Sequence, residues 1–517
     1  MAKKDTRHLK QGLLFGTVAL LLSNIFVKGL GFLYRVILVR LIGTEGMGLV
    51  EMVNPLFGFV LVIGGWGIAL AVSKMTAEAE ARGQTVQVRK IFSSALITLI
   101  ISGLLISFLT WALSPFIIKN FAPDPRIRYC FQLLIPSIFI ICVASAFRGF
   151  FHGMQRITAI GNSQSIEQAV RFIVGILLAS QFISAGVVKA SGAIAIGTLA
   201  GETAGLIYLV SLFWRQRSLM QINGLSFSPK VAAKLISFGT PVTFYRVVSS
   251  AIMMLQAFLI PLALQRSGLS VSASTAAYGC FSGVAVALLH LPGVFTSALS
   301  VSVLPAVAES NANPNLLQHR ISNSLQATTV FTLPGMVLLN IFAAPLCSLI
   351  FHNSDAALPL QILTWGGIFI YMQVTLISIL QGLGHLGILL RNNIISGGIT
   401  LGLVYLLTAN SGWGIRGTAL ASTLGALLGF ALNFSYLLRR EKLQINWSNV
   451  FLKPLGACAL AFGAVHLFSK FSGLLINSGS KLGVIILMVF FIGVYFAALS
   501  LCGGLSIGVW RRLIKRR

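Results

Sequence analysis

The sequence predicts an all-α, polytopic membrane protein, with fourteen transmembrane helices forming two pseudo-symmetric six-helix lobes, two additional C-terminal helices and a central cavity. Three observations lead to this fold class: an apolar composition, recurring apolar stretches of membrane-spanning length, and an internal repeat. Of the 517 residues, 56% are hydrophobic and 9% are charged, and the mean hydropathy is +0.89. A soluble chain of this length would need far more charge to cover its surface, so the composition indicates an integral membrane protein.

Apolar stretches of about 20 residues, the length that crosses a bilayer as a helix, recur along the chain. The residue alternation of a membrane β-barrel is missing from them, so helices are expected. We predict spans near residues 12–39, 49–73, 91–118, 130–151, 159–182, 187–213, 234–264, 274–304, 322–351, 358–384, 388–409, 414–438, 453–470 and 482–505.

An internal repeat divides the chain into halves. "FGT" occurs at Phe15 and Phe238, and "ALAVS" from Ala69 returns as "ALSVS" from Ala298. Further weak matches keep the same order at similar offsets. Because each half holds an even number of spans, both halves enter the membrane from the same side. They are therefore expected to be parallel repeats with a cavity between them.

The repeat sets the predicted domain boundaries. We expect an N-terminal six-helix lobe at 1–214, a cytoplasmic linker at 215–230 and a C-terminal six-helix lobe at 231–440. Residues 441–517 would supply two additional transmembrane helices and a basic cytoplasmic tail.

The basic residues predict the orientation in the membrane. If the N-terminus lies inside, 25 of the 38 Lys and Arg residues fall in internal segments and 9 in external connections. Cytoplasmic segments carry an excess of Lys and Arg, so both termini are expected in the cytoplasm. The net charge of +27 is thereby explained by topology, and no basic domain suited to nucleic acid is present.

The sequence does not indicate a metal site, a disulfide framework or an ATP-binding loop. The six cysteines lie scattered in apolar stretches without metal-ligand spacing, so neither a metal site nor a disulfide framework is indicated. The phosphate-binding loop GxxxxGK[ST] is missing, so ATP binding through that motif is not expected. We expect no cofactor and no catalytic residue.

Four basic residues lie within predicted spans, and three of them, Lys28, Arg35 and Arg246, lie in the first and seventh spans. Arg246 lies near the bilayer midplane, Lys28 lies in the outer half of the first span, and Arg35 lies nearer the external surface. A charge near the bilayer centre is costly and usually faces a polar cavity or a partner, although Lys28 and Arg35 could also snorkel to the interface. The first and seventh spans lead the two halves and carry these cations, so we predict that the cavity binds an anion, with arginine contacting phosphate or diphosphate oxygens.

The fifth and sixth spans add three charged candidates. Glu167 and Arg171 are four residues apart and share a helix face, which permits a charge-neutralising pair. Glu202 has no partner nearby in the sequence. It could meet Arg171 across the cavity or act as a titratable coupling group.

Several motifs resemble one family. "GFLYRVILVRLIGTEGMGL" (31–49), "AVSKMTAEAEARGQ" (71–84), "RGFFHGMQ" (148–155) and "SQSIEQAVR" (163–171) closely resemble stage V sporulation protein B-like polysaccharide flippases. These belong to the superfamily of multidrug, oligosaccharidyl-lipid and polysaccharide exporters. The resemblance covers essentially the whole chain and is strongest in the first half.

The resemblance implies a flippase of the bacterial plasma membrane. Its substrate would be an undecaprenyl-diphosphate-linked saccharide, a peptidoglycan or other envelope precursor, with sporulation as a candidate setting. Arg35 in "GFLYR" matches a basic first-span position of related lipid II flippases, whereas their other cavity arginines find no match, because span 2 has none and Arg246 lies in span 7. The implied partners are this saccharide, membrane lipids and envelope-synthesis enzymes, with no nucleic acid and a monomeric chain.

Three other functions stay open at this point. A cation-coupled multidrug antiporter of the same superfamily would favour acidic groups in the lobes. A membrane glycosyltransferase or polymerase would need catalytic or metal-binding carboxylates, but the chain has only three aspartates and no DxD or DD sequence. A scaffold that does not transport is the third alternative.

Overall fold

The computed structural model describes residues 2–217, 224, 226–310, 313–441, 446–472 and 481–504, with side chains from residue 23 onward except 471 and 472. Across these residues the regular structure is helical and no β-strand occurs. The predicted all-α class is therefore confirmed. Residues 218–223 and 225 of the predicted linker, and the basic tail after residue 504, lie outside the described residues.

Fourteen helices in the described part of the chain are long and apolar enough to cross a membrane. The chain is thus a multi-pass membrane protein with the predicted number of such helices, but several bounds differ from the prediction. Helix α1 (Ala2–Gly65) joins the first two predicted spans across a break at Gly43. The predicted span 274–304 is divided by a turn at residues 290–292, where Pro292 lacks the amide hydrogen that a continuing helix needs.

The helices fall into two compact units. Unit 1 contains residues 1–262 and 270–279, and unit 2 contains 263–269 and 280–517. The elements of unit 1 are α1, α2 (Ile68–Ala81), α3 (Thr85–Phe121), α4 (Ile127–Gly153), α5 (Ile157–Phe182), the short η1 (Ile183–Ala185), α6 (Val187–Gln216), most of α7 (Pro229–Arg266) and α8 (Val271–Gly279). Those of unit 2 are η2 (Cys280–Val286), α9 (Ala287–Leu289), α10 (Gly293–Ser310), α11 (Pro314–Ile341), α12 (Ala343–Phe351), α13 (Ala357–Gly382), α14 (Leu386–Thr408), α15 (Gly414–Glu441), η3 (Ser448–Leu452), α16 (Lys453–Ser472) and α17 (Lys481–Leu501).

These units do not share the boundaries of the predicted lobes. Most of α7 and all of α8 were expected in the lobe at 231–440, yet residues 229–262 and 270–279 pack within unit 1. The symmetry of two six-helix lobes and the cavity between them stay predictions.

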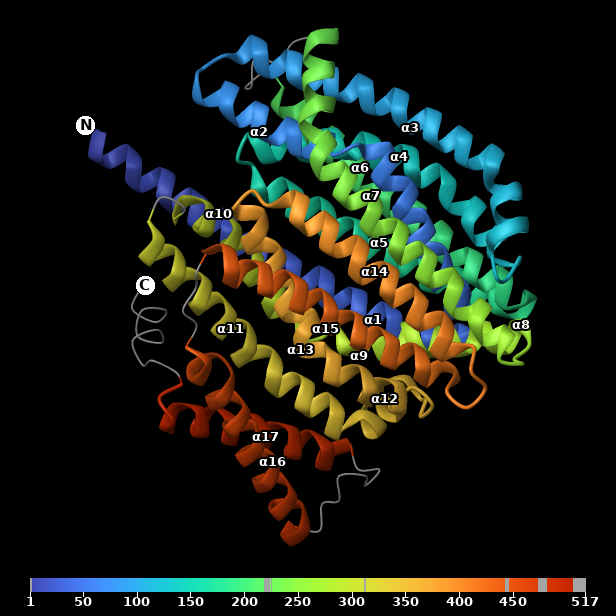
Figure 1. Cartoon of the computed structure of the whole chain (residues 1–517). Helices are drawn as coiled ribbons and strands as arrows, with labels where there is room; N and C mark the ends of the chain where they lie inside the picture. The colour runs from blue at the N-terminus through green and yellow to red at the C-terminus, as the bar shows by residue number, and fades with distance from the viewer. Residues whose placement is uncertain are drawn as a thin grey trace. The chain divides into compact units, whose positions relative to one another are not determined.

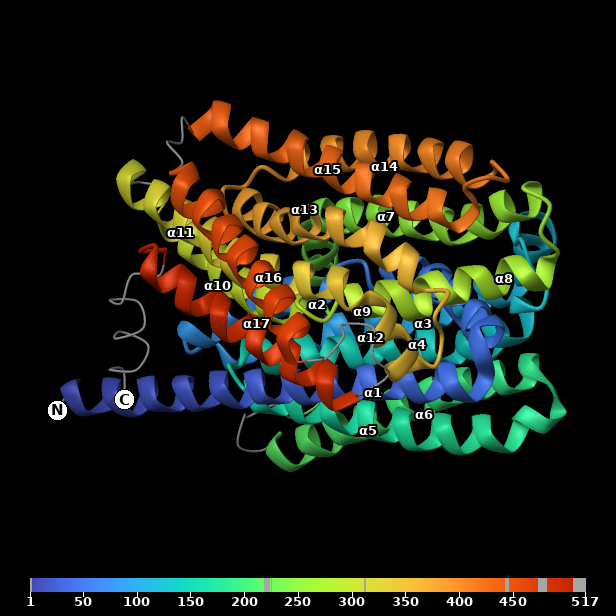
Figure 2. The ribbon, with the colours of Figure 1, turned by 90° about the horizontal axis from the view of Figure 1, so that it is seen from below.

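In unit 1, α1, α5 and α6 run side by side, as Figures 1 and 2 both show. Small residues allow this close packing. A Cβ atom added at Gly197 would come within 2.6 Å of the Gly175 Cα, and one at Gly201 within 2.6 Å of the Glu167 carbonyl oxygen. Glycine at these positions lets the α5 and α6 backbones approach, and this places the polar residues of α6 against those of α5.

In unit 2, α13 and α15 pack together, and α14 lies against α15 (Figure 2). The last two helices, α16 and α17, pack on each other and on α11. The buried Tyr495 of α17 donates a hydrogen bond of 2.9 Å to the Val330 carbonyl of α11. The C-terminal helix pair is thereby attached to the rest of its unit.

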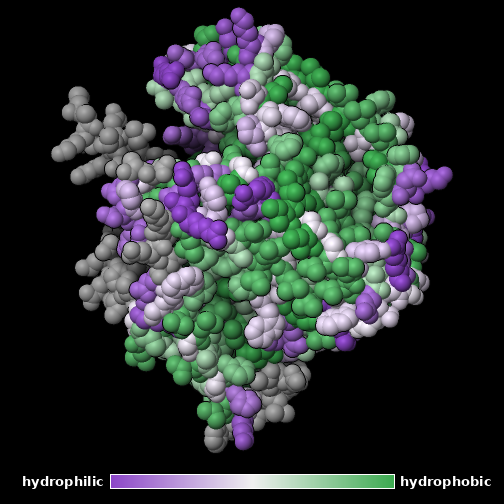
Figure 3. Space-filling view, viewed as in Figure 1, coloured by the Kyte–Doolittle hydropathy of each residue, from purple (hydrophilic) through white to green (hydrophobic). Residues whose placement is uncertain are grey.

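The surface of unit 1 follows the pattern expected of membrane-spanning helices. Figure 3 shows apolar residues over the middle of α3 and α7, with polar residues gathered at the α2–α3 connection and near α8. Exposed large side chains of α3 include Phe108, Trp111 and Phe116. Exposed apolar residues of this size are stable in contact with lipid, so this face fits a bilayer.

Candidate functional site

The candidate site begins with the break in α1. Gly43 has φ 71° and ψ 179°, a conformation that is essentially restricted to glycine. The break lets the two parts of α1 fold back on each other, so that Arg35 Nη2 and Glu51 Oε1 lie 2.8 Å apart. Their separation along one continuous helix would be about 24 Å. A single glycine thus creates an ion pair between two predicted spans.

A second set of charges joins α4, α5 and α6. The Arg171 guanidinium lies 2.7 Å from Glu167 and 2.8 Å from Glu202. Arg148 lies 2.8 Å from Glu167 and 3.5 Å from Glu202. Two cations and two carboxylates therefore neutralise one another within three membrane helices, which is how buried charges persist away from water.

These charges surround one cavity of about 430 Å³, formed entirely within unit 1. Its polar lining comes from α1, α5 and α6. The lining residues are Gly31, Tyr34, Arg35, Leu38, Met47, Val50, Glu51, Asn54, Phe57, Leu61, Leu134, Ile141, Gln168, Arg171, Ile194, Thr198 and Glu202. Because Arg35 pairs with Glu51 and Arg171 pairs with Glu202, the charges on the cavity wall balance.

The predicted site residues are thus only partly assembled. Arg35, Arg171 and Glu202 line the cavity, and Glu167 stands behind Arg171 as its partner. Lys28 is exposed on α1, and Arg246 is exposed on the part of α7 that belongs to unit 1. Neither is part of the cavity wall, so their predicted phosphate contacts stay predictions.

Sequence reasoning did not anticipate Glu51 and Arg148 as partners. Glu51 lies at the start of a predicted span, where a carboxylate is expected to reach the membrane surface. Arg148 lies near the cytoplasmic end of the predicted span 130–151, so it is one of the 25 basic residues assigned to internal segments. Both charged residues are visible in the sequence, but their partners are not. The Glu51 pair depends on the folding back of α1, and the Arg148 pairs depend on the close approach of α5 and α6.

A further polar cluster fixes the α3–α4 connection. Arg126 contacts Asp124 at 2.8 Å and Glu45 at 2.7 Å, and Thr275 of α8 donates a 2.8 Å hydrogen bond to Asp124. Burial of the Asp124 carboxyl opposes its ionisation, but the hydrogen bonds from Arg126 and Thr275 outweigh burial and lower its pKa. This cluster holds α1, α8 and the α3–α4 connection together within unit 1.

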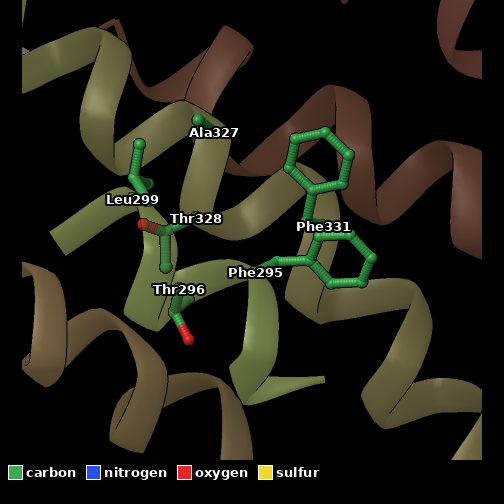
Figure 4. Close-up of a pocket in the computed structure, with 6 residues that line it drawn as sticks. All are labelled: Phe295, Thr296, Leu299, Ala327, Thr328 and Phe331. Atoms are coloured by element: carbon green, nitrogen blue, oxygen red, sulfur yellow. The ribbon is translucent and has the colours of Figure 1, made fainter. Parts of the chain in front are cut away.

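Unit 2 has an apolar hollow of about 220 Å³ between α10 and α11 (Figure 4). Phe295 and Phe331 stack there with ring centroids 5.5 Å apart. The hydroxyls of Thr296 and Thr328 are already hydrogen-bonded, to the Gly293 carbonyl and the Thr375 hydroxyl. The hollow therefore suits an apolar group and not a polar headgroup.

Comparison with known proteins identifies the family of this chain. Residues 13–311 match the model of a family described as polysaccharide biosynthesis protein, and this match covers more than half of the chain. The chain belongs to this family. The predicted resemblance to flippase-like proteins of the exporter superfamily is confirmed.

Several curated relatives are similar to this chain over most of its length. It is 28% identical to stage V sporulation protein B of Bacillus subtilis (strain 168), over 81% of this chain and 82% of that protein. It is 23% identical to the lipid II flippase MurJ of the same organism, over 68% of this chain and 69% of the flippase. A solved structure of a lipid II flippase MurJ in an inward closed conformation has a TM-score of 0.69 and 17% identity, over 97% of this chain and all of the other. This structural similarity shows that the two proteins share a fold.

Proposed function

We propose that this protein is a flippase that moves an undecaprenyl-diphosphate-linked saccharide from the inner to the outer leaflet of a bacterial plasma membrane. The observation that carries the proposal is the family membership, together with similarity to stage V sporulation protein B along most of both chains. The polar cavity among membrane-spanning helices supports it, because a hydrophilic headgroup needs such a path through the bilayer.

Transport would proceed by alternating access, in which the site opens first to the cytoplasm and then to the outside. Both termini would be cytoplasmic, as the distribution of basic residues indicates. The saccharide precursor would belong to peptidoglycan or another envelope polysaccharide, and sporulation would be one setting. Envelope-synthesis enzymes would supply and consume it, and the chain would act as a monomer and not as an enzyme.

Arg246 is our candidate for the diphosphate contact. It is exposed on α7, and its side chain has no ion pair among the described residues. Its planar guanidinium can donate two parallel hydrogen bonds to phosphate oxygens. Lys28 and Arg35 lie seven residues apart on one side of α1, and would assist as the headgroup enters.

The Glu167, Arg171 and Glu202 group would act in one of two ways. It could neutralise charge inside unit 1, or a proton on Glu202 could couple to transport. The short distances support the first role, since both carboxylates lie within 2.8 Å of Arg171. An antiporter for organic cations would be favoured by unpaired carboxylates in this cavity, and Glu202 is paired.

The direct test is a leaflet assay in proteoliposomes. Purified protein would be reconstituted with fluorescent undecaprenyl-diphosphate-linked saccharide, and the fraction reached by a membrane-impermeant reagent would be followed over time. We expect exchange between leaflets that protein-free liposomes lack. Export of an organic cation without movement of the lipid would favour the antiporter, and movement of neither would refute transport.

A further inference from the structure

The cavity of unit 1 has the lining of a saccharide site and not of a phosphate site. Building on the proposed function, we infer that it binds the sugar part of the lipid-linked substrate, through Asn54, Gln168 and Tyr34. This assigns different parts of one substrate to different groups of the protein: the sugar to this cavity and the diphosphate to Arg246.

The first argument is charge. Arg35 and Glu51 meet at 2.8 Å, and so do Arg171 and Glu202, so each cation on the wall already has a carboxylate partner. A diphosphate brought into this cavity would be repelled by the two carboxylates as much as it is attracted by the two cations. An anion in a low-dielectric site needs a surplus of positive charge or many hydrogen-bond donors. The balanced wall therefore favours a neutral polar ligand.

The second argument is the set of unused hydrogen-bonding groups. The side-chain amides of Asn54 and Gln168 make no hydrogen bond to any described residue, although both line the cavity. The hydroxyl of Tyr34 and Nε of Arg171 are buried and also lack a partner in the described part of the protein. Buried polar groups in folded proteins are nearly always hydrogen-bonded, so the Tyr34 hydroxyl and Arg171 Nε call for a ligand or water. Asn54 is exposed, and its amide adds free donors and acceptors at the cavity wall.

The chemistry of these groups fits a sugar. An amide side chain donates two hydrogen bonds and accepts two, which matches neighbouring hydroxyls and an N-acetyl group. Tyr34 and Phe57 add aromatic rings to the same wall, and aromatic surface packs well against the apolar face of a pyranose ring. A volume of about 430 Å³ lies within the range of about 300 to 1,000 Å³ that is common for small-molecule sites.

The test compares two soluble short-chain probes, farnesyl diphosphate and farnesyl-diphosphoryl-N-acetylglucosamine. Binding to the full-length protein in detergent would be measured by calorimetry. Two variants remove the amides, Asn54→Ala and Gln168→Met, the second of which keeps the side-chain length. The matched control is Gln181→Ala, which removes an exposed amide from the same helix as Gln168.

We expect the sugar-bearing probe to bind the wild type more tightly than farnesyl diphosphate. Each cavity variant should weaken binding of the sugar-bearing probe about tenfold, or about 1.4 kcal/mol, while affinity for farnesyl diphosphate stays within about twofold. Gln181→Ala should match the wild type. Equal loss for both probes, or no loss for either, would overturn the inference but leave the proposed function standing. A wild type that binds neither probe would count against the proposed function as well.

Discussion

Arg35 and Glu51 form an ion pair of 2.8 Å although both belong to α1, at positions that one continuous helix would hold about 24 Å apart. The pair exists because Gly43 breaks the helix with a positive φ. Sequence periodicity treats the two sides of this break as separate spans, and the structure shows what the break accomplishes: it places a cation and a carboxylate on the wall of one cavity.

Replacing Gly43 should therefore disturb the cavity from a distance. In Gly43→Ala, the new Cβ meets no atom within 4 Å, but φ 71° with ψ 179° is strained for alanine. We expect a loss of about 1 to 3 kcal/mol of stability, seen as a lower thermal unfolding temperature in detergent. Gly29→Ala is the control, because Gly29 lies in the helical part of α1 and also has free space around its Cβ position. Equal unfolding temperatures for the two variants would show that the break is not under strain.

The four charges of α4, α5 and α6 should behave as one unit. Glu167→Gln leaves Arg148 and Arg171 with a single carboxylate, and Arg171→Gln leaves two carboxylates with a single arginine. Each single change should cost about 3 kcal/mol, because it leaves a charge without its partner. The double change retains the Arg148 and Glu202 pair and should recover at least half of the loss. Additive losses in unfolding experiments would mean that the residues act independently.

The Asp124 cluster predicts a pH dependence of stability. Its lowered pKa means that the ionised carboxylate stabilises the fold above the ordinary value of 3.8, and that this contribution disappears as the pH falls through the lower, folded-state pKa. Asp124→Asn should cost about 2 kcal/mol at pH 7, and its unfolding temperature should approach that of the wild type as the pH falls below 3.8. Asp355→Asn changes an exposed carboxylate in the α12–α13 connection and should match the wild type at each pH. A constant difference between Asp124→Asn and the wild type across this range would contradict the assignment.

Orientation can be tested by cysteine labelling. In a variant without the native cysteines, Ser184→Cys should react with an impermeant maleimide added outside, because it lies in a predicted external connection. Arg82→Cys should react only after permeabilisation. Both positions are exposed, so a difference would report the side of the membrane and not burial. The reverse pattern would invert the topology inferred from the basic residues.

Much of the fold could be predicted from the sequence, because the length of an apolar stretch is fixed by the bilayer and does not depend on distant contacts. The Glu167 and Arg171 contact is local to one helix, and their spacing already placed them on one face. Glu51 and Arg148 were missed because their partners lie on other helical segments. Their contacts depend on the break at Gly43 and on the close packing at Gly197 and Gly201, which periodicity alone does not reveal.

The most direct measurement of the central claim is translocation of a lipid-linked saccharide by Arg246 variants in proteoliposomes at matched protein levels. If Arg246 holds the diphosphate, Arg246→Ala should abolish headgroup transfer, and Arg246→Lys should restore it only in part, because an ammonium cannot donate the paired hydrogen bonds of a guanidinium. Arg82→Ala, which removes an exposed arginine from the α2–α3 connection, should leave transfer unchanged. Wild-type rates in Arg246→Ala would contradict the diphosphate contact, and a wild type that transfers no lipid-linked saccharide would contradict the account as a whole.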